Sequence, residues 1–379
     1  MSVVPLADAS REHGRKAHGL GVLLRAGLAV PAGFVVTDPA VDPRVVAAHL
    51  DRLPGRAVAV RSSGLAEDSA TASFAGQFET VLGARGLDGV LAALRHCAAS
   101  SQTERARGYR AHLGLDDEAT VPVIVQSLVE ADRAGVLFTR DPRTGSYAMV
   151  VNASWGLGES VVSGAVVPDE VVVTGMGDTV QLTVGAKATR LDLGEHGLVR
   201  SAVPGPDRRR GCLTPEEIAQ LVLLGLTCED LFGQAQDLEW AIRDGRIWLL
   251  QARPITALGT ATAPSADDAT RPLLTGVPSS PGRALGPARI IRSVDDFSRL
   301  RAGDVLVCRT TDPAWTPLFG LASAVVTETG GILCHAAIVA REFGIPAVVA
   351  AAEATTILTE DAPVTVDGTV GTITEGLGR

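Results

Sequence analysis

The order of hydrophobic and polar residues predicts strands and helices in several stretches of the chain. The apolar, β-branched stretch of residues 322–328 predicts a buried strand, and Gly330 and Gly331 after it allow a sharp turn. Residues 335–343, HAAIVAREF, have helical composition, and Gly344 is a favourable left-handed residue for ending that helix. The pattern therefore predicts a mixed α/β (α+β) protein, with His335 at the first position of a helix.

The predicted place of His335 suits a phosphoryl carrier. A helix N-terminus presents unpaired N–H groups and the positive end of the helix dipole, and both favour an anion. The same field disfavours the imidazolium form, which leaves a neutral, nucleophilic ring nitrogen. The alternative is a histidine that only caps a helix or occupies a surface position, and the local pattern does not separate the two.

A second predicted helix carries one of the two lysines of the chain. Residues 16–27 place Leu20, Leu23 and Leu24 on one face and end at Gly27. Lys16 in the first turn is unfavourable for the helix dipole, and a bound phosphate would relieve this. Because Lys and Arg together number 34 and the only lysines are Lys16 and Lys187, both are candidates for tasks that need a compact ammonium. A solvated surface lysine is the alternative for Lys16.

Residues 237–254 predict a β-hairpin around Asp244 and Gly245. A three-residue loop, Arg243 to Gly245, would keep two sets of side chains on opposite faces. One set is apolar and comprises Leu238, Trp240, Ile242, Trp248 and Leu250, and the other is polar and comprises Asp237, Glu239, Gln251 and Arg253. Carboxylate and carboxamide oxygens with a guanidinium are what a magnesium triphosphate requires. A half-exposed hairpin with an ordinary polar face is the alternative.

Two further stretches contain candidate functional residues, and the first is suited to a phosphate site. In residues 57–82, a β-rich start delivers Arg61 and leads to a loop of small residues with one aromatic side chain, ASFAGQ at 72–77. Small residues let the backbone approach phosphates closely. In residues 152–173, a glycine-rich turn precedes Glu159, and a second acidic turn holds Asp169. Neither stretch alone is strong evidence for a functional site.

Composition and charge narrow the function classes. The chain has 379 residues and a net charge of −9, which argues against nucleic acid or an anionic membrane as the main partner. The five scattered cysteines lack CxxC spacing, so neither a disulfide framework nor a zinc site is expected. We see no signal peptide and no spanning segment, and expect a cytoplasmic protein. Residues 256–272 resemble an interdomain linker in composition, between domains at 1–255 and 273–379.

Taken in order, these stretches resemble the family of pyruvate phosphate dikinase, phosphoenolpyruvate synthase and rifampicin phosphotransferase. Residues 1–255 resemble its ATP-grasp nucleotide-binding domain. Residues 273–379 resemble its small swivelling phosphohistidine domain, through PGRALGPARI, DVLVCRTTDPAWTPLF, the GG…HAAIVAREFGIPAVV core and VDGTVGTI. The resemblance covers nearly the whole chain, and several long motifs agree with the family in order and spacing.

The resemblance implies a role for each matching residue. His335 would be phosphorylated by ATP, typically with the β-phosphoryl group so that AMP is the product, and would then swing to an acceptor. Glu239 and Gln251 would hold Mg²⁺. The residues implied to contact or cover the nucleotide phosphates are Lys16, Arg61, Arg253 and the loop Ser73, Phe74, Ala75, Gly76 and Gln77.

The sequence departs from the family pattern at three places. HGRK stands around Lys16 in place of the more usual Gly-Gly-Lys. Cys334 precedes the histidine where a Ser or Thr is commoner, which puts a hydroxyl contact to the phosphoryl group in question. We find neither the TIM barrel nor the helical domain that would bind an acceptor, so we do not expect pyruvate chemistry from this chain alone.

Three function classes follow. The favoured class is a phosphotransferase that uses ATP and Mg²⁺ to phosphorylate a small-molecule acceptor through phosphohistidine. The second is one subunit of a split dikinase, whose acceptor site lies on a partner protein. The third is an ATP-grasp ligase, which would release ADP and would not need His335.

Overall fold

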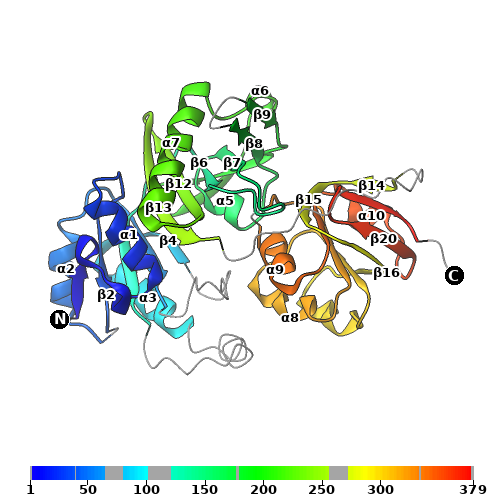
Figure 1. Cartoon of the computed structure of the whole chain (residues 1–379). Helices are drawn as coiled ribbons and strands as arrows, with labels where there is room; N and C mark the ends of the chain where they lie inside the picture. The colour runs from blue at the N-terminus through cyan, green and yellow to red at the C-terminus, as the bar shows by residue number, and fades with distance from the viewer. Residues whose placement is uncertain are drawn as a thin grey trace.

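The computed structural model describes residues 2–38, 40–64, 80–100, 121–175, 179–255, 272–332 and 334–376. The chain forms a larger N-terminal part and a smaller C-terminal lobe, which meet near α5, α9 and β15 (Figure 1). Two large sheets and a separate hairpin lie before residue 255, and an eight-stranded sheet lies after residue 273. The mixed α/β organisation predicted from the residue pattern is confirmed.

The first sheet has five strands, all antiparallel to their neighbours. Its strand order is β1 (Val3–Pro5), β2 (Gly33–Val36), β5 (Val123–Ser127), β3 (Val58–Ser62) and β4 (Thr80–Ala84). The helices of this region are α1 (Arg15–Arg25), α2 (Pro43–Leu50) and α3 (Gly86–Ser100). The helix predicted at 16–27 is therefore present as α1, and Gly27 just beyond it has φ +78°.

The second sheet has six antiparallel strands and carries the predicted hairpin at its edge. Its strand order is β13 (Arg246–Pro254), β12 (Gln236–Arg243), β6 (Arg133–Phe138), β7 (Met149–Trp155), β8 (Asp169–Thr174) and β9 (Thr179–Thr183). The elements beside it are α5 (Glu159–Val162), α6 (Gly205–Arg208), α7 (Pro215–Phe232) and the hairpin of β10 (Thr189–Leu193) and β11 (Leu198–Ala202). The core between α1, α7 and this sheet includes the fully buried Leu20, Leu221 and Trp240.

The C-terminal lobe is built on an eight-stranded mixed sheet. Its strand order is β14 (Leu274–Thr275), β21 (Thr372–Glu375), β20 (Pro363–Asp367), β16 (Arg283–Ile290), β17 (Val305–Cys308), β18 (Ala324–Thr327), β19 (Ala347–Val349) and β15 (Val277–Ser280). The strands β16 to β19 are parallel, and the helices are α8 (Thr316–Phe319), α9 (His335–Phe343) and α10 (Ala354–Ile357). Both the strand predicted within 322–328 and the helix predicted at 335–343 are confirmed, as is the left-handed Gly344 that ends the helix (φ +65°).

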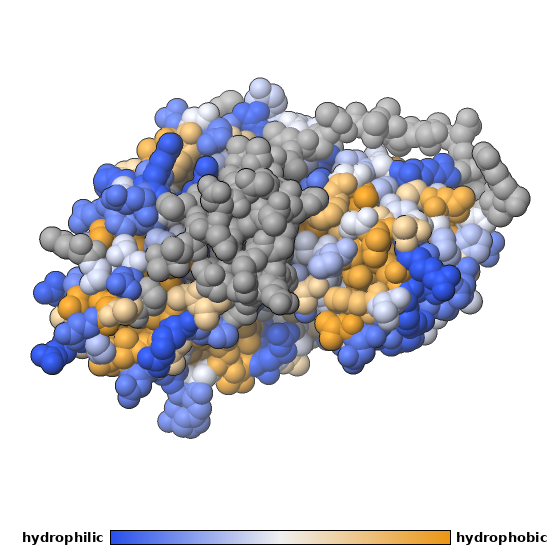
Figure 2. Space-filling model, turned by 90° about the horizontal axis from the view of Figure 1, so that it is seen from below, coloured by the Kyte–Doolittle hydropathy of each residue, from blue (hydrophilic) through white to orange (hydrophobic). Residues whose placement is uncertain are grey.

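Hydrophobic residues also reach the surface of both parts. On the face in Figure 2, hydrophobic and hydrophilic residues are interspersed, with a broad hydrophobic area on the C-terminal lobe. Leu321, after α8, and Phe343, the last residue of α9, are among the exposed hydrophobic side chains of this lobe. The surface around the helix that begins with His335 is thus partly apolar.

Candidate active site

The hairpin brings the predicted metal ligands together, although its loop differs from the prediction. Glu239 on β12 lies directly opposite Gln251 on β13. The loop has two residues, Asp244 and Gly245, both with positive φ (49° and 74°), and not the predicted three. The register shifts between Glu239 and Trp240, so that Trp240 pairs with Leu249. This β-bulge supplies the extra residue that we had placed in the loop.

The bulge also corrects the predicted apolar face. Ile247 and Leu249 are buried, and Leu249 lies opposite Trp240. Trp248 and Leu250, which we had predicted for this face, are only partly buried, and Trp248 pairs with Ala241. The polar side chains still share one face, as predicted, because the bulge between the loop and Gln251 restores the parity that the shorter loop changes.

Arg61 connects the two large sheets at this hairpin. Its Nη2 lies 3.3 Å from Glu239 Oε2, and its Nη1 donates to the backbone oxygen of Leu250 over 3.2 Å. Arg61 Nε is buried and has no hydrogen-bond partner among the described residues. A buried donor of this kind favours an additional acceptor, such as a phosphate oxygen.

Helix α1 places Lys16 in the same region. The backbone N–H of Ala17 donates to Ser63 Oγ over 3.0 Å, which fixes the first turn of the helix against the chain just after Arg61. One turn further on, α1 packs so closely on β13 that a Cβ at Gly19 would lie 2.9 Å from the Ala252 oxygen. Lys16 is the second residue of α1 and is partly buried. The structure thus brings the segments that carry Lys16, Arg61 and Gln251 together.

Arg253 also lies on the hairpin. It pairs across the strands with Asp237, and its Nε donates to Asp237 Oδ2 over 2.8 Å. The pair is mostly buried, with 18% of the Arg253 side chain and 7% of the Asp237 side chain exposed. Asp237 therefore orients the guanidinium that we expect to contact phosphates.

Glu159 is a further acidic group of this site. It is the first residue of α5, and desolvation by the surrounding protein together with the Glu239 carboxylate raises its pKa, against the opposing effect of Arg61. We had noted Glu159 in a glycine-rich turn but had not predicted it as a ligand, because its closeness to Glu239 is a long-range contact. Two carboxylates that disfavour each other's charge are typical of a cation site.

The donor groups fit a magnesium–nucleotide complex better than a metal held by protein alone. In the described part of the chain, no three His, Cys, Asp or Glu side chains form a metal-binding cluster. Glu239, Gln251 and Glu159 supply two carboxylates and one carboxamide beside Arg61. Mg²⁺ usually takes one or two carboxylates and completes its shell with water and substrate phosphates. The remaining donors would then come from the nucleotide.

His335 lies in the other lobe, at the first position of α9, and is buried. Thr311 Oγ1 is 2.8 Å from its Nδ1, and Thr316 Oγ1 is 3.2 Å from its Nε2. The ring of Phe319 meets the imidazole edge-on, with 5.8 Å between centroids. These contacts hold the ring in one orientation. The two threonines lie inside the motif RTTDPAWTP, yet the sequence alone did not indicate that they reach the histidine.

Some predicted elements lie outside the described residues. The predicted loop residues Ser73, Phe74, Ala75, Gly76 and Gln77 belong to the segment 65–79, which lies outside the described residues. So does nearly all of the predicted linker 256–272, since residues 256–271 are not described.

Cys334 is described and is buried at the N-cap of α9, where burial raises the pKa of its thiol. Cys334 is therefore packed as a small buried side chain.

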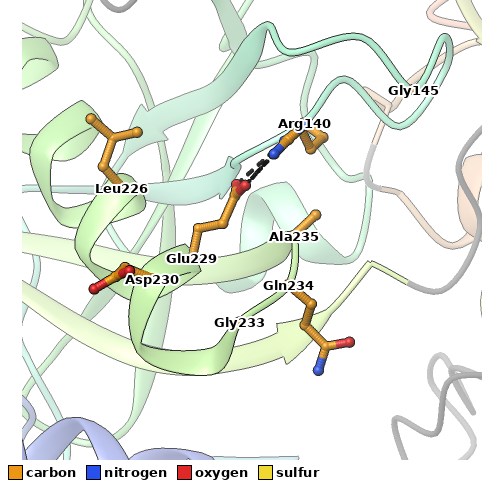
Figure 3. Close-up of a pocket in the computed structure, with 8 residues that line it drawn as sticks. All are labelled: Arg140, Gly145, Leu226, Glu229, Asp230, Gly233, Gln234 and Ala235. Carbon is orange, nitrogen blue, oxygen red and sulfur yellow. Dashed lines mark hydrogen bonds and ion pairs between the residues drawn. The ribbon is translucent and has the colours of Figure 1, made fainter.

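The structure also has an open pocket of about 510 Å³ at the end of α7. Figure 3 shows Arg140 and Glu229 pointing toward each other in it, and Arg140 Nε donates to Glu229 Oε1 over 3.2 Å. The pocket is lined by Arg140, Gly145, Leu226, Glu229, Asp230, Gly233, Gln234 and Ala235. None of the predicted site residues lines it, and its charged pair is already satisfied.

Two family profiles match this arrangement of a nucleotide region followed by a histidine lobe. The one described as "Pyruvate phosphate dikinase, AMP/ATP-binding domain" matches residues 44–272, and the one described as "PEP-utilising enzyme, mobile domain" matches residues 300–371. The chain belongs to the pyruvate phosphate dikinase and phosphoenolpyruvate synthase family of phosphotransferases, as the resemblance predicted. The two-domain α+β fold that the resemblance implied is confirmed with it.

Curated relatives carry the name phosphoenolpyruvate synthase. The chain is 43% identical over 321 residues to the "Probable phosphoenolpyruvate synthase" of Methanothermobacter thermautotrophicus, covering 84% of this chain and 47% of the relative. It is 40% identical to the "Phosphoenolpyruvate synthase" of Pyrococcus furiosus, covering 84% and 41%, and 41% identical to that of Neisseria meningitidis, covering 84% and 44%. The chain thus spans less than half the length of these relatives.

No helix in the described part of the chain is both long enough and apolar enough to cross a membrane.

Proposed function

We propose that this chain transfers a phosphoryl group from ATP to His335 and from there to a small-molecule acceptor. Residues 1–255 serve as the nucleotide-binding domain, residues 273–379 as the phosphohistidine domain, and residues 256–272 as the linker between them. The observation that carries the proposal is His335 itself: a buried imidazole at a helix N-terminus, with a threonine hydroxyl at each ring nitrogen, inside the lobe that matches a PEP-utilising mobile domain.

In this proposal the nucleotide lies between the hairpin, β3 and the start of α1. Lys16, Arg61 and Arg253 bind phosphate oxygens, and the loop 73–77 covers them. Glu239 and Gln251, with Glu159 beside them, would hold Mg²⁺, which supplies charge neutralisation for the triphosphate when it is bound. The Arg61–Glu239 ion pair opens as the phosphates bind, and Arg61 Nε gains the acceptor that it lacks.

We assign Nε2 as the nucleophile, with the ring proton on Nδ1. Nδ1–H donates to Thr311 Oγ1, so the Nε2 lone pair is left to attack. In this tautomer the Thr316 hydroxyl, 3.2 Å from Nε2 and 3.0 Å from the Pro313 oxygen, donates to Nε2 at rest and turns to the Pro313 oxygen when the incoming group takes its place. A bond forms between Nε2 and the β-phosphorus, the bond that joins this phosphorus to AMP breaks, and water takes the γ-phosphoryl group as phosphate. The acceptor then displaces His335 from the remaining phosphoryl group.

The acceptor is proposed to be a small polar molecule that binds in the crevice between the two domains. Closure of a crevice excludes water from a labile phosphoryl group. The relatives' printed name makes pyruvate the first acceptor to test, beside amino-acid-like and natural-product acceptors. A split dikinase, in which a partner protein binds the acceptor, and a ligase are outcomes that the experiment separates.

The test is labelling with ATP that carries a radioactive β-phosphate, in the presence of Mg²⁺. We expect an acid-labile, base-stable label on the wild-type chain, AMP as the nucleotide product, and no label on His335→Ala, which still binds ATP. His196→Ala, in an exposed position, is the matched control and should label normally. Equal labelling of His335→Ala, or ADP as the product with no labelled protein, would contradict the proposal. If a phosphorylated product forms only after a second protein is added, the acceptor site belongs to that protein.

A further inference from the structure

The turn before His335 is packed against the N-terminal domain at one short segment, the turn that follows α5. Thr329 Oγ1 donates to the backbone oxygen of Gly164 over 2.9 Å. A Cβ added at Gly164 would lie 2.6 Å from the Cβ of Cys334, while its next neighbours would be at ordinary distances of 3.6 Å. Because real Cβ atoms essentially never approach that closely, only glycine at position 164 allows this contact with the residue that precedes His335.

A second contact lies beside the first. A Cβ at Gly331 would lie 2.9 Å from Pro168 Cγ and 3.1 Å from Asn152 Oδ1. Ile332 is fully buried in a small apolar cluster with Val136, Phe138 and Val150 of the six-stranded sheet. Residues 329–332 and Cys334 are therefore fitted closely into a surface formed by the turn after α5, the start of β8 and the sheet behind them.

The same short helix also reaches the nucleotide site. Glu159 is the first residue of α5 and is close enough to Glu239 for that carboxylate to raise its pKa, whereas Gly164 follows the helix by two residues. Four helical residues rise about 6 Å along the axis. The candidate metal ligand and the contact for the histidine turn therefore lie at the two ends of one element.

We propose that Gly164 and Thr329 are positioning residues that seat the phosphohistidine domain on α5 and thereby place His335 for phosphorylation. This inference rests on the proposed function. The docked position also carries a cost that favours release of the domain. Asn152 Oδ1, beside Gly331, is buried and has no hydrogen-bond partner among the described residues. An unpaired buried acceptor costs free energy and therefore opposes docking. A close glycine contact and one hydrogen bond give a defined position, and the unpaired oxygen limits how long the domain stays there.

The experiment measures single-turnover labelling of His335 from ATP and Mg²⁺ by rapid quench, beside ATP affinity and melting temperature. Gly164→Ala should slow labelling at least tenfold with ATP affinity unchanged. Gly233→Ala, at the end of α7 and away from the proposed site, is the matched control: its φ of +67° is similar to the +70° of Gly164, and nothing lies within 4 Å of its added Cβ. Thr329→Val should slow labelling about two- to tenfold, the effect of losing one neutral hydrogen bond.

The decisive variant is a size exchange. Cys334→Gly removes the Cβ that the alanine would meet, so Gly164→Ala combined with Cys334→Gly should label faster than Gly164→Ala by at least threefold. Wild-type labelling in Gly164→Ala overturns the proposal, as does slow labelling that Cys334→Gly does not improve. Failure of the proposed function looks different, because then the wild-type chain itself carries no label on His335.

Discussion

The buried ion pair of Lys187 and Asp169 provides a quantitative test of the structure. Lys187 is fully buried, and its ammonium pairs with Asp169 Oδ1 and donates to the Gly185 oxygen over 3.1 Å. Asp169 also accepts backbone N–H groups from Gly185 and Cys212, each over 2.8 Å. The carboxylate thus joins β8 to two segments that are distant from it in the sequence. Lys187→Met removes the charge and keeps most of the side-chain volume.

The expected loss in the free energy of unfolding follows from the charge that Lys187→Met leaves unpaired. Asp169 would keep its two backbone donors but would be a buried charge without a counter-ion, and removing one partner of such a pair costs about 3–5 kcal/mol. The two remaining charge-assisted hydrogen bonds place the expected loss near the lower end, at about 3 kcal/mol in the free energy of unfolding. For a domain of this size each kcal/mol shifts the melting temperature by about 2–4 °C, so we expect a decrease of about 6–12 °C.

The assay is the melting temperature of the N-terminal transition at pH 7, followed by calorimetry. A second variant that combines Lys187→Met with Asp169→Asn removes both charges and should recover at least about 1 kcal/mol, since replacing a whole buried pair is far less costly than breaking it. A decrease below about 2 °C for Lys187→Met would refute the reasoning. So would a double variant that is less stable than the single one.

Three further outcomes test the site. Glu239→Ala should lose most nucleotide turnover without unfolding, whereas the control Glu216→Ala, at an exposed position on α7, should keep it. Normal turnover in Glu239→Ala would show that the hairpin is not the nucleotide site. Thr311→Val should slow labelling of His335 about two- to tenfold through loss of one hydrogen bond, and an unchanged rate would contradict the assigned tautomer. Because the pKa of Glu159 is raised above 4.5, its ionisation lowers stability as pH rises through the folded-state pKa. Because Glu159 keeps an exposed part despite its partial desolvation, Glu159→Gln should be only slightly more stable than the wild type at pH 7, by less than about 1 kcal/mol. The difference should vanish below pH 4, and a gain that persists in acid would contradict this cause.

Local features of the fold were predictable because local chemistry determines them. The helix 335–343 follows from its residue pattern and from Gly344, whose left-handed conformation ends it. The hairpin at Asp244 and Gly245 follows from a dipeptide that suits two consecutive positive φ values. The bulge at Glu239 and Trp240 was not predictable, because a bulge and a longer loop have the same effect on residue parity.

The parts of the site that escaped prediction are long-range contacts. Arg61 was predicted as a phosphate ligand from the resemblance, but its ion pair with Glu239 depends on how two sheets pack. Thr311 and Thr316 reach His335 from a segment about 20 residues earlier, and no periodicity relates such positions. For Lys187 the sequence indicated a task but not its nature. The rarity of lysine made it a candidate for a task that needs a compact ammonium, and the structure places it in a fully buried ion pair with Asp169.

The burial of Lys187 has a practical consequence for chemical labelling. The sequence contains only two lysines, and the folded chain encloses one of them completely, so Lys16 is the single lysine side chain that an amine-reactive reagent can acylate in the native protein. The chain is in effect a one-lysine protein whose reactive amine is a candidate nucleotide contact. Modification at this residue, located by peptide mapping so that it is separated from acylation of an α-amine, would report nucleotide occupancy, and unfolding would be recorded as acylation of Lys187.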